Sequence, residues 1–325
     1  MIRRVACGIA AATAAVCAVA GPMAADDPGS LEVLPAQGNV HVLAAAGGNT
    51  TVQVGSEGPL VVDTQPAALS EKVIEAVRKL SPRPIRHIVL TSGGDQQAGG
   101  AAKLSKAGRY IRVIDTIDPR GIDIRASIIA HLNVLNRMNA DNVPSDSWPT
   151  DTYFTQEWSI FSNGEAVQLV HVESAHSDGD TVVFFRRSDV ISTGAIFDAS
   201  GYPRFDPARG GSIAGVIEGL NRVLDIAVPG ENQEGGTVIV PGRGRLSDET
   251  DVANYRDMVT IIRDRVRALV AKRMSVEQVQ QAKPTSDYDG LFEARNDWTR
   301  EMFVDAIYRD LTKSGERDSA GGPKQ

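Results

Sequence analysis

The 325-residue sequence predicts an α/β fold in which two β-sheets pack face to face and helices cover their outer sides. Two observations support this four-layer αβ/βα sandwich. Short apolar runs of strand character alternate with segments whose apolar residues recur at helical spacing. These segments follow the order sheet, helices, sheet, helices, so each half of the chain supplies one sheet and the helices that cover it.

The first half of the chain begins with short strands joined by glycine-containing turns. Strands are predicted at 40–43, 51–54, 60–63 and 85–90. A helix is expected at 70–80, because Val73 and Val77 share one face with other apolar residues. Proline residues break the chain after this helix, and a second helix is expected at 125–138.

Strand patterns resume in the second half, after a loop at 143–155. These strands are predicted at 166–170, 181–185, 190–192 and 237–240. A helix at 212–226 lies between the last two strands. Long amphipathic helices follow at 251–274 and 293–311, and residues 314–325 are polar. We therefore expect a sandwich domain over 30–275 and, over 276–325, a C-terminal helical extension with a polar tail.

The first 25 residues have the pattern of a secretory signal peptide and a linker. Arg3 and Arg4 precede an apolar, alanine-rich stretch, which ends in the small-x-small sequence at Ala18 to Ala20. The stretch is shorter than the roughly 20 residues that span a bilayer. We therefore expect cleavage, a secreted or periplasmic protein, and no membrane insertion afterwards.

The cysteine content and the charge of the chain argue against cysteine chemistry and against two classes of partner. The two cysteines, Cys7 and Cys17, both lie in the signal segment, so the mature chain has no disulfide, thiolate zinc ligand or cysteine nucleophile. The net charge of −7 is spread over runs of mixed sign. Such a surface gives no reason to expect nucleic acid or an anionic membrane as a partner.

The segment from Leu90 to Gly100 reads Leu-Thr-Ser-Gly-Gly-Asp-Gln-Gln-Ala-Gly-Gly and follows a predicted strand. It resembles the metallo-β-lactamase superfamily, whose members carry Thr-His-x-His-x-Asp-His-x-Gly-Gly at this strand-to-helix corner. Aligned on Thr91 and on the final glycine pair, the four zinc-ligand positions of the family motif hold other residues here. These are Ser92, Gly94, Gln96 and Gln97.

Further motifs extend the resemblance over about 35–275, towards a secreted bacterial branch of hydrolase-like members. They are Asn49, Val62-Asp63-Thr64, His176-Ser177-Asp178-Gly179-Asp180, Ser192-Thr193-Gly194-Ala195, Tyr202-Pro203 and Pro241-Gly242-Arg243-Gly244. In the family, three of these motifs supply the remaining ligands of a two-zinc site. Those positions hold His176, Ala195 and Arg243, so His176 is the one ligand of seven that this chain retains.

This donor set is a poor match for zinc. A zinc ion takes three or four nitrogen, sulfur or oxygen ligands from the protein, and a catalytic zinc also binds a water. Gln96 and Gln97 offer neutral oxygens, and Arg243 brings a permanent positive charge to the centre. We therefore expect no zinc and no other cofactor.

A ligand site without metal is the first hypothesis for this region. The guanidinium of Arg243 would bind a carboxylate or phosphate, with Gln96 and Gln97 adding neutral hydrogen bonds. His131, on a helix that borders the pocket in the related branch, is a further candidate contact. The alternatives are a solvated loop arginine and a histidine that only packs.

A second hypothesis makes Ser92 the nucleophile and His176 its base, because the family places these two positions side by side. The alternative is a structural histidine at the sheet edge. Among the acids, Asp63 is expected to cap its own turn, and Asp95 to point away from the former metal centre.

We therefore expect a secreted protein derived from a hydrolase, which is itself non-hydrolytic and binds a small molecule. The competing expectation is a hydrolase of an ester, thioester, lactam or phosphoester that uses a rebuilt or metal-free site. The sequence does not identify the ligand, because substrate choice in a fold of this kind depends on its loops.

Overall fold

A seven-stranded sheet forms one half of the molecule, in the order β1-β2-β3-β4-β5-β6-β7. The computed structural model describes residues 30–110, 124–292, 295 and 297–320, so the predicted signal peptide lies outside it. Strands β1 to β4 pair antiparallel, and β4 to β7 pair parallel. The strands are β1 Leu31–Gln37, β2 Val40–Ala45, β3 Gly48–Gln53, β4 Leu60–Val62, β5 His87–Val89, β6 Ser127–His131 and β7 Asp151–Tyr153.

A five-stranded sheet forms the other half, in the order β12-β11-β10-β9-β8. Its neighbours pair antiparallel except for β11 and β12, which run parallel. The strands are β8 Glu157–Ser162, β9 Glu165–Val172, β10 Asp180–Phe185, β11 Val190–Ser192 and β12 Val238–Val240. Parallel pairs place their carboxyl ends at one edge of a sheet, which is where ligand sites form in such folds.

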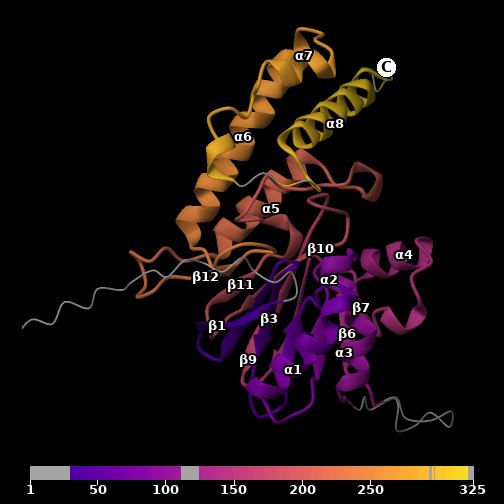
Figure 1. Ribbon diagram of the computed structural model, residues 1–325, viewed down its shortest axis with the longest axis vertical. Coiled ribbons are helices and arrows are strands. Elements are labelled where there is room, and N and C mark those ends of the chain that lie inside the picture. The colour runs from indigo at the N-terminus through magenta and orange to yellow at the C-terminus, as the bar shows by residue number, and fades with distance from the viewer. Residues whose placement is uncertain (1–29, 111–123, 293–294, 296, 321–325) are drawn as a thin grey trace, which may run out of the picture.

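The helices occupy the outer sides of the two sheets. They are α1 Ser70–Leu80, α2 Asp95–Ala98, α3 Ala101–Ala107, α4 Leu132–Ala140, α5 Ile213–Ile226, α6 Glu249–Ala271, α7 Val276–Gln281 and α8 Arg300–Ala320. Figure 1 shows α6, α7 and α8, coloured orange to yellow, at the top of the molecule and far from α1 and α3. No helix in the described ranges is both long and apolar enough to cross a membrane.

Three apolar cores confirm the four-layer arrangement. One core lies between the sheets and joins Val62 and Ile129 of the first sheet to Leu169 and Phe185 of the second. The second packs α1 and α3 on the outer face of the seven-stranded sheet. The third packs α5, α6 and α8 on the outer face of the five-stranded sheet, where Phe303 of α8 is fully buried. Each sheet thus buries both of its faces.

The expected helix at 125–138 is wrong in its first half. Residues 127–131 form β6, which lies between β5 and β7 in the sheet, and the helix α4 begins only at Leu132. All five residues of β6 are buried. A parallel strand buried on both faces is a continuous apolar run, and such a run cannot be distinguished from helix by periodicity alone.

Two other differences concern polar segments. Strands β1, β7 and β8 were not predicted, because their residues are largely polar or exposed and lack a regular apolar alternation. The last helix begins at Arg300 rather than Glu293 and continues to Ala320, beyond the expected end at Leu311. The division of the chain at residue 275 stays a prediction.

Candidate functional site

The seven positions that resemble a zinc-ligand set gather at one edge of the sandwich, at the carboxyl ends of β5, β11 and β12. Six of them line a single cavity of about 300 Å³, and the seventh, Ser92, lines a small adjoining space together with His176. The six are Gly94, Gln96, Gln97, His176, Ala195 and Arg243. The sequence prediction that these distant segments meet at one centre is therefore confirmed geometrically.

The loop after β5 keeps its shape through short polar contacts. Ser92 is buried, and its hydroxyl donates to Oε1 of Gln97 over 3.3 Å and accepts from the backbone N–H of Gly94 over 3.4 Å. Gly94 precedes the short helix α2, which carries Gln96 and Gln97 into the cavity wall. Both glutamines, which stand at ligand positions of the family motif, thus line the cavity.

Asp63 anchors this loop from the neighbouring strand. Its buried carboxylate accepts hydrogen bonds from the backbone N–H of Thr91 over 2.8 Å and from the Thr91 hydroxyl over 2.7 Å. The expectation that Asp63 caps its own turn is therefore wrong, because its partner is the end of β5. Burial raises the pKa of Asp63 to about 7, and the Thr91 hydrogen bonds oppose that shift.

The end of β11 approaches this anchor closely. Gly194 has a φ of +53°, and a Cβ built on it would lie 2.2 Å from the hydroxyl oxygen of Thr91. Only glycine fits this position, since both the backbone conformation and the space exclude a side chain. The next residue, Ala195, stands at the family's aspartate position and offers the cavity only a methyl group.

His176 lies between β9 and β10, and a hydrogen bond at Nδ1 fixes its ring. Its Nδ1 lies 2.8 Å from the carbonyl oxygen of Arg204. The nearby carboxylate of Asp180 is buried and accepts from the N–H and hydroxyl of Ser177, which fixes the turn after His176. Burial raises the pKa of Asp180 to about 6, while the charge of His176 acts in the opposite direction.

Arg243 lies in the turn after β12, which β3 holds in place. Asn49 of β3 donates its side-chain amide to the carbonyl oxygens of Pro241 and Gly244, each over 2.9 Å. The half-buried guanidinium of Arg243 donates to the carbonyl of Ala46 over 3.0 Å, and it forms no ion pair with any residue that the structure describes. Burial lowers the pKa of this guanidinium, and the positive charge of Arg295 lowers it further.

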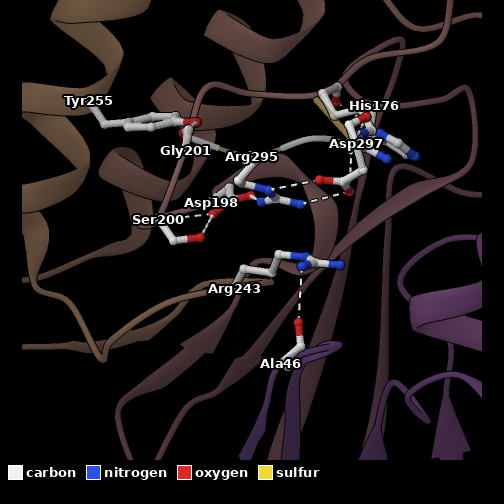
Figure 2. A network of polar contacts seen from close by, with 10 residues as sticks. Ala46, His176, Asp198, Ser200, Gly201, Arg243, Tyr255, Arg295 and Asp297 are labelled. Atoms are coloured by element: carbon white, nitrogen blue, oxygen red, sulfur yellow. Dashed lines mark hydrogen bonds and ion pairs between the residues drawn. The ribbon is translucent and has the colours of Figure 1, made fainter. Parts of the chain in front are cut away.

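Four charged residues around the cavity were missed by the sequence analysis. Arg295, from the segment before α8, pairs with Asp198 over 3.0 Å and with Asp297 over 3.1 Å, and Arg204 pairs with Asp297 over 2.9 Å. Figure 2 shows Arg295 next to Asp198 and Asp297, with Arg243 below it and bonded to Ala46 instead. No local motif marks these residues, because they meet only through tertiary packing.

The proposed nucleophile and base pair lacks the contact that it needs. Within the described residues no hydrogen bond joins Ser92 to His176, because the Ser92 hydroxyl binds Gln97 and Gly94 and the His176 ring binds a carbonyl group. In the same part of the chain, no carboxylate forms a hydrogen bond with the ring. The catalytic hypothesis stays a prediction, and the geometry gives it no support.

His131 is not among the residues that line the cavity. It ends β6 instead of lying on a helix, and its ring stacks on His171 of the other sheet at 3.7 Å between centroids. Asp95 is exposed and is among the residues that line the cavity. Its Oδ1 lies beside Gly99 at the end of α2, and the expectation that it points away from the former metal centre stays a prediction.

Comparison with known proteins identifies the fold. No protein-family model matches the chain, and no curated protein matches its sequence. Among solved structures, a metallo-β-lactamase from Pontibacter korlensis matches with a TM-score of 0.54 and 14% identity, covering 71% of this chain and 99% of that one. The DIM-1 metallo-β-lactamase matches with a TM-score of 0.53 and 14% identity, covering 71% of this chain and 97% of that one. The chain has the metallo-β-lactamase fold.

A larger protein of this fold matches over more of the chain. The sec-alkyl sulfatase PisA1, in a doubly mutated form, has a TM-score of 0.63 and 11% identity, covering 86% of this chain and 50% of that one. Sequence identities this low establish a shared architecture only. What the site of this chain does must be argued from its own residues.

The zinc of the metallo-β-lactamase family does not fit the residues present. Of the seven positions aligned with the family's zinc ligands, only the one at His176 holds a good zinc ligand, and the charge of Arg243 would repel a dication. In the described part of the chain no three histidine, cysteine, aspartate or glutamate residues cluster so that they could hold a metal ion. The fold is that of these structures, and the absence of zinc stays a prediction that the donor set supports.

Proposed function

We propose that this chain is a secreted protein of the metallo-β-lactamase fold that binds a small anionic molecule without zinc and without hydrolysing it. One observation carries the proposal: Arg243 lies at a cavity of about 300 Å³, and its half-buried guanidinium hydrogen-bonds among the described residues only to the carbonyl of Ala46. Asp198 and Asp297 act on this charge from a distance, but neither forms a direct ion pair with Arg243 among the described residues. An anion in the cavity would reduce the cost of burying the charge and would bind the remaining N–H groups. Secretion rests on the predicted signal peptide.

The other arginines explain why Arg243 is the proposed anchor. Arg204 and Arg295 are already paired with Asp297 and Asp198, so much of their charge is offset inside the protein. Arg243 keeps most of its five N–H donors available. A carboxylate or phosphate group matches the planar fork of a guanidinium.

A hydrolase with a metal-free site is the alternative. Its support is Nε2 of His176, which no described residue binds and which a water molecule beside a bound ester, thioester, lactam or phosphoester would reach. The lactamase and sulfatase activities named for the similar structures belong to those proteins. The alternative lacks a second residue to orient the base, so binding without turnover is favoured.

The test compares anion binding by the wild type with that of two arginine variants. Phosphate and small carboxylates should raise the melting temperature of the wild type at constant ionic strength. Arg243→Gln should weaken binding about tenfold to a hundredfold, because a hydrogen bond to a charged group contributes roughly 1.5–3 kcal/mol. Arg245→Gln is the matched control, since Arg245 lies two residues further along, is 70% exposed and pairs with Asp251.

Equal anion binding by the wild type and Arg243→Gln would overturn the proposal. A panel of ester, thioester, lactam and phosphoester substrates separates binding from hydrolysis. Turnover that exceeds the buffer rate and is lost in a His176→Phe variant would establish the alternative instead.

A further inference from the structure

The imidazole of His176 has a defined hydrogen-bonding state. A carbonyl oxygen only accepts hydrogen bonds, so the 2.8 Å contact with Arg204 requires the proton on Nδ1 of His176. The neutral ring then carries its lone pair on Nε2. No residue in the described ranges forms a hydrogen bond with Nε2. The atom is also not buried, since it is absent from the buried polar atoms without a partner. The lone pair is therefore open to the cavity that the ring lines.

The same cavity presents groups of opposite character. Arg243 offers only hydrogen-bond donors, because a guanidinium has no acceptor atom. One of its N–H groups binds the carbonyl of Ala46, and the others remain for a ligand. His176 offers an acceptor. The two residues come from segments on different strands, the turn after β12 and the turn after β9, and both line the cavity of about 300 Å³. A ligand that fills this space meets a positive donor and a neutral acceptor.

We infer that the bound anion carries an O–H group that donates to Nε2 of His176 while its charged oxygens bind Arg243. This inference rests on the proposed function and specifies its ligand class. Two kinds of anion meet the requirement: an inorganic oxyanion that keeps a proton, such as hydrogen phosphate, and a carboxylate with a hydroxyl on the adjacent carbon. Their shared chemistry is an acidic group with a hydrogen-bond donor beside it.

The physical basis is the cost of an unmatched acceptor. A site that hydrogen-bonds an O–H group discriminates against the analogue that lacks it, because the acceptor of the site then loses its partner. The lone pairs of an oxyanion without a proton would in addition repel the lone pair on Nε2 of His176. A fully ionised oxyanion or a plain carboxylate should therefore bind more weakly than its O–H counterpart.

Two matched pairs of anions test the inference by isothermal titration calorimetry. Phosphate and sulfate are both dianions at about pH 8, where an ordinary histidine is neutral, and only phosphate keeps an O–H. Lactate and propionate are both monoanions, and only lactate has the hydroxyl. We expect the O–H member of at least one pair to bind about tenfold more tightly. The pair that shows the preference tells whether the O–H lies on the anion itself or on the adjacent carbon.

Two variants assign the preference to His176. His176→Phe keeps a ring and removes both nitrogens, so the preference should vanish. His176→Gln keeps an acceptor oxygen and should retain part of it. A preference that persists unchanged in His176→Phe would overturn the inference, and the wild-type comparison of the two pairs is decisive even if the variants do not fold.

The outcomes separate this inference from the proposed function. Anions that bind in an Arg243-dependent way, but equally within both pairs, would overturn the O–H requirement and leave the anion site standing. The absence of any anion binding to the wild type would overturn both. Arg245→Gln is again the control and should keep both the affinity and the preference of the wild type.

Discussion

Asp63 shows how a single side chain sets the shape of this site. The sequence places it at the end of a strand and predicts a local turn contact, but its carboxylate binds Thr91, which lies 28 residues further along the chain. The difference has a physical reason: β4 and β5 are parallel neighbours, so their carboxyl ends lie next to each other. Residue identity indicated a structural role, and only the strand order determined the partner.

The pH dependence of stability tests this contact. The folded-state pKa of Asp63 is raised from 3.8 to about 7, so the folded protein holds a proton that the unfolded chain releases. Its contribution to stability is complete below about pH 4 and is lost as the pH rises to about 7. Asp63→Asn should remove this loss and keep an acceptor for Thr91. Urea unfolding from pH 4 to 7 checks this, and a wild-type-to-variant difference independent of pH would contradict it.

At the scale of elements, hydrophobic periodicity predicted the amphipathic helices well and failed where burial was complete. Helix α1 has the predicted bounds, 70–80, because its apolar residues repeat along one face. Strand β6 was predicted as helix because all of its residues face protein. Hydrophobic periodicity arises when one face of an element is apolar and the other is polar. A strand that is buried on both faces is apolar on both and shows no such periodicity.

The start of helix α4 depends on a histidine, which gives a second pH prediction. Nδ1 of His131 accepts from the N–H of Asn133 and caps the helix, and the ring stacks on His171. Burial lowers the pKa of His131 to about 4, and the charge of His171 adds to the shift. This contribution to stability is complete above about pH 6.5 and is lost as the pH falls towards 4.

His131→Asn keeps a good capping residue and removes the titration. Its melting temperature should therefore fall less than that of the wild type between pH 7.5 and 5, which thermal unfolding measures. Some loss should remain, because the pKa of His171 is also lowered by burial. A variant that loses as much stability as the wild type would show that the cap does not titrate in this range.

The docking of helix α5 on the second sheet gives a third prediction. A Cβ built on Gly215 would lie 1.8 Å from the carbonyl oxygen of Ser174, so the helix and the turn after β9 are in direct backbone contact. Gly215→Ala should destabilise the fold by more than about 2 kcal/mol, although alanine favours helices. Gly230→Ala is the control, with nothing within 4 Å of the added carbon, and should change stability by less than about 0.5 kcal/mol. Equal unfolding midpoints for the two variants would contradict the contact.

At the scale of the whole molecule, the sequence predicted the layers and the meeting of seven distant positions, and it missed the charges around them. The layers follow from local patterns that each segment displays by itself. Arg295 and Asp198 are 97 residues apart, and their ion pair exists only because the segment before α8 returns to the edge of the five-stranded sheet. A pairing of this kind leaves no periodic or motif signal in a single sequence.

The loss of metal ligands and the gain of charge belong to the same site. Ala195 and Arg243 occupy two former ligand positions, and Arg295 with Asp198 adds an ion pair to the same wall of the cavity. The guanidinium of Arg243 thus places a positive charge at a position where the family motif has a zinc ligand. At the scale of the whole molecule, we propose that this cavity is a preformed pocket for an anion.

The zinc content of the protein purified without chelator, measured by mass spectrometry after dialysis against zinc, tests the central claim most directly. We predict far less than one zinc ion per chain and no rise in melting temperature on adding zinc, because only His176 of the seven positions is a good donor. About two bound zinc ions per chain, with hydrolysis that EDTA abolishes, would contradict it.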